Sequence, residues 1–192
     1  MNFEKNNKYI VIYDTTLREG MQNVGTSYTV KDKIRLARLL DDIGVAYIEG
    51  GIPGANPKDD EFYKEMTNVS LKNAKLVAFG ATCRINMSPE EDSMLNALVQ
   101  CDTETVCIFG KSWLLQVKDI LSCEPDVNIY KIESSVRFLK AAGKEVIFDA
   151  EHFFDGYKDN REYAMAAVNA AFKGGADYVV LCDTNGGTLP GE

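Results

Sequence analysis

A charged pair, Arg18-Glu19, directly follows the first apolar run of this chain. The run at residues 9–13 ends in Asp14-Thr15-Thr16-Leu17-Arg18-Glu19-Gly20. A guanidinium matches planar oxyanions, and a carboxylate suits a hard divalent cation. Arg18 is therefore a candidate for binding a carboxylate or polarising a carbonyl, and Glu19 for ligating Mg²⁺, Mn²⁺ or Zn²⁺. The alternatives are a surface ion pair between Arg18 and Glu19, or a role for Glu19 as the acidic residue at a helix N-terminus.

Another carboxylate, Glu49, ends the second apolar run, at residues 45–49. A carboxylate at the end of a buried strand is costly unless it has a partner. Glu49 is therefore either a residue of a substrate site or the partner of a backbone N–H or of Arg18.

Acidic residues are densest after the fifth run, where residues 149–156 hold three acids and the only histidine, His152. If the strand extends this far, alternation predicts Asp149 and Glu151 on one face and Ala150 and His152 on the other. Glu151 is a candidate general base, whereas we expect His152 to be structural. After the sixth run, Thr184 either donates a hydrogen bond to a substrate carboxylate or closes a turn.

The clusters follow short apolar runs that predict six strands. These runs are rich in Val, Ile, Phe and Tyr, as in strands covered on both faces. They lie at residues 9–13, 45–49, 75–80, 103–109, 145–149 and 177–181. Helices are predicted between them by apolar periodicity and end signals. One starts after Thr29 and stops at Gly44, and a second starts at Ser88, where Glu91 completes a capping box. Two more contain residues 132–140 and 162–172.

Alternating strands and helices form either a closed (β/α)₈ barrel or a doubly wound open sheet. No G-x-G-x-x-G turn follows the first strand, and candidate residues follow nearly every strand rather than one switch point. Both observations favour the α/β class and a (β/α)₈ TIM barrel. About six of its eight βα units are present, so residues 1–192 are expected to be the N-terminal part of the barrel domain.

Composition excludes several classes of partner. The net charge is −8, without a basic block, which argues against binding to nucleic acid or an anionic membrane surface. No apolar stretch reaches the length of a membrane span. The five cysteines show no C-x-x-C spacing, so we expect buried free thiols in a reducing cytoplasm.

Four motifs together resemble the 2-isopropylmalate and homocitrate synthase family, and most of all its citramalate synthase branch. Hydroxymethylglutaryl-CoA lyases are relatives of that family. The motifs are Asp14-Thr15-Thr16-Leu17-Arg18-Glu19-Gly20, Tyr47-Ile48-Glu49-Gly50-Gly51, Glu151-His152-Phe153-Phe154-Asp155-Gly156-Tyr157 and Leu181-Cys182-Asp183-Thr184-Asn185-Gly186-Gly187-Thr188. The resemblance covers nearly the whole chain. It implies a TIM-barrel acyltransferase with a divalent metal (Mg, Mn or Zn) that condenses acetyl-CoA with a 2-oxo acid. In the citramalate branch the acid is pyruvate, and the product feeds isoleucine biosynthesis.

The resemblance also implies roles for five residues. Arg18 matches the catalytic arginine, Glu151 the proposed base, and Thr184 a threonine near the substrate carboxylate. Glu49 aligns with an acidic residue of the barrel mouth. Glu19 stands where the family has an acidic metal ligand. That ligand is usually Asp in citramalate synthases and Glu in homocitrate synthases, so 2-isopropylmalate or homocitrate synthase activity stays an alternative.

Further parts of the family pattern are not found in these 192 residues. The resemblance implies a His-x-His metal motif on a seventh strand and a C-terminal domain that dimerises. We therefore expect a homodimeric full-length protein and an inactive 192-residue fragment. Two other functions stay open. One is a carbon–carbon lyase of the hydroxymethylglutaryl-CoA lyase type, which Met21-Gln22-Asn23 also resembles, and the other is a non-catalytic module that binds an anion or a partner.

Overall fold

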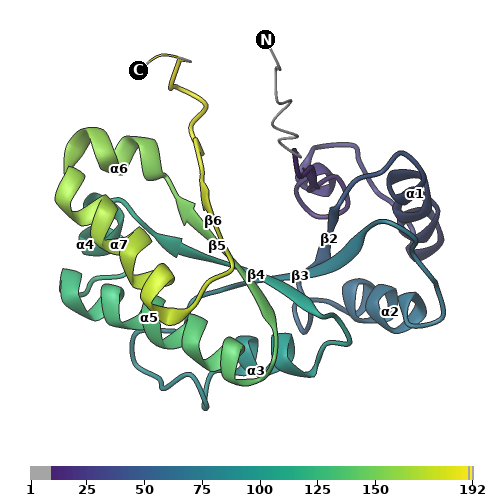
Figure 1. Cartoon of the computed structure of the whole chain (residues 1–192), viewed down its shortest axis with the longest axis horizontal. Coiled ribbons are helices and arrows are strands. Elements are labelled where there is room, and N and C mark those ends of the chain that lie inside the picture. Colours follow the sequence, from purple (N-terminus) through teal and green to yellow (C-terminus); the bar gives the residue numbers. More distant parts are fainter. Residues whose placement is uncertain (1–9, 190, 192) are drawn as a thin grey trace, which may run out of the picture.

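The architecture is one curved parallel sheet with helices on its outer side (Figure 1). A computed structural model describes residues 10–189 and 191. The six strands lie side by side in the order β1-β2-β3-β4-β5-β6, and every neighbouring pair is parallel. They are β1 (Tyr13–Asp14), β2 (Tyr47–Gly51), β3 (Lys75–Ala81), β4 (Thr105–Lys111), β5 (Glu145–Glu151) and β6 (Tyr178–Leu181). This sequential order is that of a barrel and not of a doubly wound sheet, whose strand order reverses.

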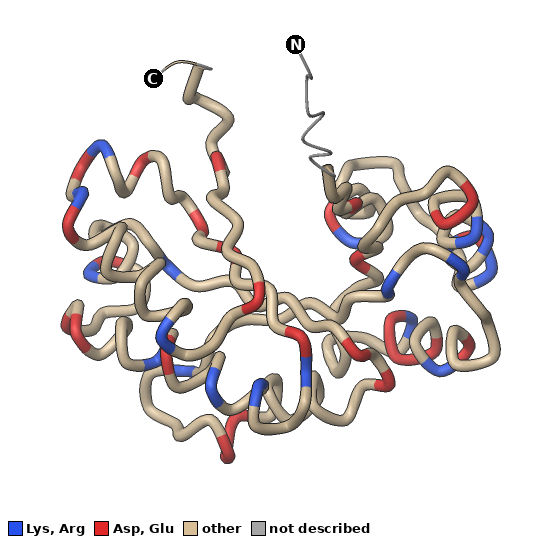
Figure 2. The backbone as a smooth tube through the Cα atoms, viewed as in Figure 1, with Lys and Arg blue, Asp and Glu red and all other residues tan. Residues whose placement is uncertain are grey.

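Helices connect the strands, and the α-helices pack on the convex face. They are η1 (Glu19–Gln22), α1 (Val30–Asp42), α2 (Pro57–Met66), α3 (Ser93–Gln100), α4 (Leu114–Asp119), α5 (Pro125–Ala141), α6 (Phe153–Asp159) and α7 (Arg161–Gly174). Acidic and basic positions are interspersed along these outer helices (Figure 2). Among the described residues, none of the helices has both the length and the apolar character needed to cross a membrane.

Two apolar clusters show which face of the sheet each side chain occupies. The larger one joins outward-facing strand residues, such as Ile48, Val106 and Phe148, to the helices. The smaller one lies on the concave face and contains Tyr47, Val77, Phe79, Cys107 and Ile147. The concave face is therefore partly apolar below its charged rim, as the filled interior of a barrel would be.

Several predicted element ends are confirmed. Thr29 caps α1, because its hydroxyl accepts from the Asp32 N–H at 3.2 Å while the Asp32 carboxylate accepts from the Thr29 N–H at 2.9 Å. Gly44, just past α1, and Gly175, just past α7, have φ angles of +86° and +97°, which favour glycine.

Other predicted boundaries are wrong. The first strand is only Tyr13–Asp14; residue 9 lies outside the described residues, and residues 10–12 are not strand. The predicted capping box forms only in part. The Ser88 N–H and hydroxyl both donate to the Glu91 carboxylate, whereas the Glu91 N–H donates to the Ser88 carbonyl and not to its side chain, and the segment after Ser88 is a turn. Helix α3 starts at Ser93, because the Asp92 carboxylate caps it by accepting from the N–H groups of Met94 and Leu95. The five cysteines are free thiols, as predicted, but only Cys83 and Cys107 are buried.

Candidate active site

Arg18 lies at the centre of the charged residues on the concave rim. The chain turns sharply after β1, where the Thr15 carbonyl accepts from the Arg18 and Glu19 N–H groups at 3.1 and 2.8 Å. Leu17 is buried in the core and anchors this turn. The Arg18 guanidinium carbon lies 3.8 Å from the centroid of the Phe79 ring. Its Nη1 donates to Glu19 Oε2 at 2.7 Å. The planar guanidinium is thus fixed by stacking as well as by charge.

Glu49 of β2 is fully buried and forms an ion pair with Arg18, which lies in the turn after the neighbouring strand β1. Arg18 Nε donates to Glu49 Oε1, and the Tyr13 hydroxyl donates to Glu49 Oε2 at 2.5 Å. Burial raises the pKa of Glu49, and the charge of Arg18 opposes that rise. Burial, together with Cys107 and Glu49, also raises the pKa of Tyr13, which keeps its hydroxyl a donor. From the sequence, Glu49 was either a residue of a substrate site or the partner of a backbone N–H or of Arg18. In the structure it forms an ion pair with Arg18.

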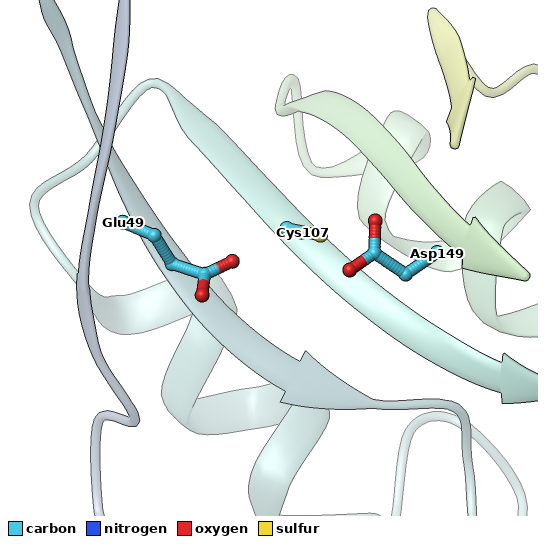
Figure 3. Close-up of side chains that lie close together, drawn as sticks. All are labelled: Glu49, Cys107 and Asp149. Carbon is cyan, nitrogen blue, oxygen red and sulfur yellow. The ribbon is translucent and has the colours of Figure 1, made fainter. Parts of the chain in front are cut away.

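Asp149 faces Glu49 across Cys107 on the concave side of the sheet (Figure 3). Ligand atoms of these three residues lie within 4.8 Å of one another. Burial first, and then the nearby Glu49 charge, raise the pKa of Asp149 to about 6. Burial raises the pKa of the Cys107 thiol well above its usual value. A neutral thiol between two carboxylates separates their charges without adding a third.

Glu151 is the last residue of β5 and pairs with Lys111, the last residue of β4. The two are direct partners in the β4–β5 register. Asp149 and Glu151 both point to the concave side, whereas Ala150 between them is buried in the outer core, so the predicted alternation is confirmed as far as Glu151. The strand ends there, and His152 follows it with a left-handed backbone.

The charged groups of β1, β2 and β5 act on one another. Asp149, Glu151, Glu49 and Arg18 all contribute to the pKa of Cys182, which burial raises to about 12. These charged residues therefore form one rim at the C-terminal ends of the strands, where barrel enzymes carry their active sites.

His152 and Thr184 cap the loop after β5. His152 has a left-handed backbone, with φ of +54°, and its N–H donates to Thr184 Oγ1 at 2.9 Å. The imidazole Nδ1 lies 3.2 Å from Asp155 Oδ2, which also accepts from Asn185 Nδ2 at 2.9 Å. This network joins β5 to the loop after β6. His152 is part of a structural network, as expected, and Thr184 keeps a hydroxyl proton to donate.

Glu19 has the donor chemistry of a hard-cation ligand. Its side chain is 57% exposed, and one carboxylate oxygen accepts from Arg18. Glu49 is a poorer donor, because each of its oxygens already has a protein partner. Cys107 is a buried neutral thiol, whereas the thiolate is the form that binds metals. Divalent Mg and Mn accept one or two carboxylates plus water, so Glu19 fits such an ion.

A cleft of about 500 Å³ opens beside Arg18, between η1 and the start of α2. Its walls include Met21, Gln22, Ile52 and Lys58. The loop that forms one wall is held by Asp59, which accepts from the Ile52 N–H at 3.0 Å. The cleft offers room for a small organic acid or the arm of a larger ligand next to the guanidinium.

Four residues at or just below the rim were not predicted from the sequence: Tyr13, Phe79, Cys107 and Lys111. Tyr13, Phe79 and Cys107 belong to apolar runs, where their types are typical of a core. Lys111 follows the fourth run, and its position just past a strand end was the available signal.

The similarity of this chain to known proteins extends over nearly its whole length. The model of the HMGL-like family matches residues 9–192. The (R)-citramalate synthase of Aquifex aeolicus is 55% identical over 95% of this chain and 35% of its own length. That of Sulfolobus acidocaldarius is 50% identical over 96% of this chain and 35% of its own length. The chain thus spans about a third of the length of these curated relatives.

Solved structures share the fold at lower identity. The hydroxymethylglutaryl-CoA lyase of Pseudomonas aeruginosa superposes with a TM-score of 0.73 at 18% identity, covering 95% of this chain and 60% of that one. With six parallel strands curled around a concave face, this likeness supports a partial (β/α)₈ barrel.

Proposed function

Because this chain belongs to the HMGL-like family, we propose that it is part of an acyltransferase that condenses acetyl-CoA with pyruvate, giving citramalate and CoA. One observation carries the choice of substrate. Five citramalate synthases are 46–55% identical to this chain, whereas 2-isopropylmalate and homocitrate synthases are 29–32% identical. The enzyme would convert its acyl group into an alkyl group on transfer and would serve isoleucine biosynthesis.

Arg18 would bind the 2-oxo acid and stabilise the charge that develops on its ketone oxygen. The contacts with Glu49 and Phe79 support this role, since they fix the guanidinium before substrate arrives. Glu49 would line the substrate site mainly through its hold on Arg18. Thr184 would donate its hydroxyl proton to the substrate carboxylate, while its oxygen keeps accepting from His152.

Glu151 would act as the general base. Its carboxylate would take a proton from the methyl group of acetyl-CoA, and the resulting enolate would attack the ketone carbon. Hydrolysis of the thioester would then release CoA. Glu19 would help to hold a divalent cation (Mg, Mn or Zn), which when bound supplies positive charge to the 2-oxo acid.

The position of this chain in a larger protein is also a proposal. Residues 1–192 would form the N-terminal part of a TIM-barrel catalytic domain, in keeping with six strands in barrel order and the partial coverage of the relatives. The full polypeptide would be a cytoplasmic homodimer. Free cysteines are in keeping with that compartment.

The test uses the full-length polypeptide that contains this chain. Purified protein is given acetyl-CoA with pyruvate, 2-oxoisovalerate or 2-oxoglutarate, and separately hydroxymethylglutaryl-CoA. We expect release of CoA with pyruvate and a product with the mass of citramalate. A preference for either other acid would favour 2-isopropylmalate or homocitrate synthase activity, and cleavage of hydroxymethylglutaryl-CoA would favour a lyase. Binding without turnover of any substrate would favour a non-catalytic module.

A further inference from the structure

The end of β4 presents a lysine to the candidate base. Lys111 and Glu151 pair across the β4–β5 ladder, and Lys111 Nζ donates to Glu151 Oε2. Their side chains are 16% and 25% exposed, so water reaches both but only in part. The Lys111 ammonium also lies 5.5 Å from the centroid of the Phe109 ring.

The backbone around this pair is tightly held. Ser112 Oγ donates to the Glu151 carbonyl at 2.6 Å, and the Ser112 N–H donates to the same oxygen at 3.3 Å. The Lys111 carbonyl accepts from Asn128 Nδ2 at 2.9 Å. Gly156 of α6 packs so closely that a Cβ there would lie 2.4 Å from the Ser112 carbonyl oxygen. Both strand ends are therefore fixed, and the side chains alone decide how Glu151 is aimed.

We propose that Lys111 is the positioning residue of Glu151, an inference that rests on the proposed function. A glutamate at a strand end has three rotatable side-chain bonds, and one fixed oxygen restricts them. The ammonium holds Oε2 and leaves Oε1 to accept the proton. In that step a C–H bond of the acetyl methyl group breaks, an O–H bond forms at Glu151, and the electron pair passes to the thioester enolate. The negative charge moves from Glu151 to the substrate, and the Lys111 charge stays in the site throughout.

The experiment measures exchange of acetyl-CoA methyl protons in D₂O, together with kcat and KM for pyruvate, in the full-length polypeptide. Lys111→Met should lower the exchange rate and kcat by roughly 10²-fold, because misplacement of a reacting group by about 1 Å costs that much. KM for pyruvate should stay within about twofold of wild type, since Arg18 and not Lys111 binds the acid. Lys111→Arg should restore part of the rate by pairing with the same carboxylate.

A double-mutant cycle separates positioning from a general structural effect. If Lys111 acts through Glu151, Lys111→Met should cost nothing further in a Glu151→Gln background. The matched control is Lys75→Met. Lys75 pairs with Glu145 at 2.9 Å at the opposite end of the same sheet, and its loss should leave kcat within about twofold.

Each outcome bears on a different claim. Wild-type protein that releases no CoA from acetyl-CoA and pyruvate would overturn the proposed function. Active wild type with an unimpaired Lys111→Met variant, or with the same fold loss in both backgrounds, would overturn the role of Lys111. If Lys111→Met does not fold, Lys111→Arg carries the test: it should lower kcat several-fold beside Glu151 and not at all beside Gln at position 151, and equal losses would again overturn the role.

Discussion

Replacing Arg18 with lysine keeps the charge and removes the geometry on which the proposed chemistry depends. The guanidinium donates through Nε to Glu49 and through Nη1 to Glu19 while it stacks on Phe79 at 3.8 Å. A lysine ammonium is a compact point charge without that planar fork. We expect kcat to fall by roughly 10²–10³-fold, the usual loss on removing one preorganised donor to a developing oxyanion.

The same position predicts a stability effect that can be separated from catalysis. Arg18→Met leaves the fully buried Glu49 with only the Tyr13 hydroxyl as a partner. Removing one member of a buried ion pair costs about 3–5 kcal/mol. The Tm of the domain that contains Glu49 should fall accordingly. Arg18→Met combined with Glu49→Gln should regain most of that loss, because the unpaired charge is gone.

The assay combines thermal unfolding with turnover of acetyl-CoA and pyruvate in the full-length polypeptide. Wild type, Arg18→Lys, Arg18→Met and the double variant are compared under one set of conditions. Regained stability without regained turnover would place Arg18 in the chemistry. Near-normal kcat in Arg18→Lys would refute the catalytic role, and an unchanged Tm in Arg18→Met would refute the account of the buried pair.

Four further predictions concern three acidic residues of the rim and the activity of residues 1–192 on their own. Glu19→Gln should weaken Mn²⁺ binding, measured by calorimetry, with partial rescue of activity at high Mn²⁺; unchanged affinity would remove Glu19 from the metal. Glu151→Gln should slow exchange of the acetyl methyl protons about 10²–10⁴-fold and leave pyruvate binding intact, and a wild-type rate would assign the base elsewhere. Burial and Glu49 raise the pKa of Asp149 to about 6, so the folded state keeps a proton that the unfolded chain releases near its usual value of 3.8. The free energy of unfolding should therefore fall by about 3 kcal/mol as pH rises through this window, and Asp149→Asn should abolish that fall; equal slopes in both proteins would contradict it. Residues 1–192 expressed alone should release no CoA, and a rate near that of the full polypeptide would show that the six strands suffice.

Much of the fold could be predicted because local signals agree with it. The capping box of Thr29 and Asp32 and the positive φ of Gly44 follow from chemistry within a few residues. Ser88 shows the limit of such signals. Ser88 donates to the Glu91 carboxylate, but the Glu91 N–H bonds the Ser88 carbonyl in a turn. The helix starts only after Asp92, which is buried and also accepts from the Arg84 N–H. That contact was not visible in the local sequence.

The sequence predicted which residues gather at the site from their positions at the ends of strands, but not how they pair. Arg18, Glu49 and Glu151 follow or end apolar runs, so barrel geometry alone gathers them. Which of them pair depends on register, since Lys111 meets Glu151 across 40 positions of chain and Tyr13 meets Glu49 across 36. Asp149 was visible as an acid, but its raised pKa comes first from burial and then from Glu49 on β2, and no local pattern specifies either.

The excess of negative charge at the rim is a physical argument for the proposed metal that does not depend on resemblance to a known family. Among the charged residues at the strand ends of the concave rim, Arg18 and Lys111 are cations, whereas Glu19, Glu49, Asp149 and Glu151 are carboxylates. Even with Asp149 protonated below its pKa of about 6, acids outnumber bases. A 2-oxo acid would add another negative charge, which a partly buried site of this sign would repel. A divalent cation beside Glu19 would offset that excess of negative charge, so substrate affinity should depend on the metal more steeply as pH rises past 6 and Asp149 ionises.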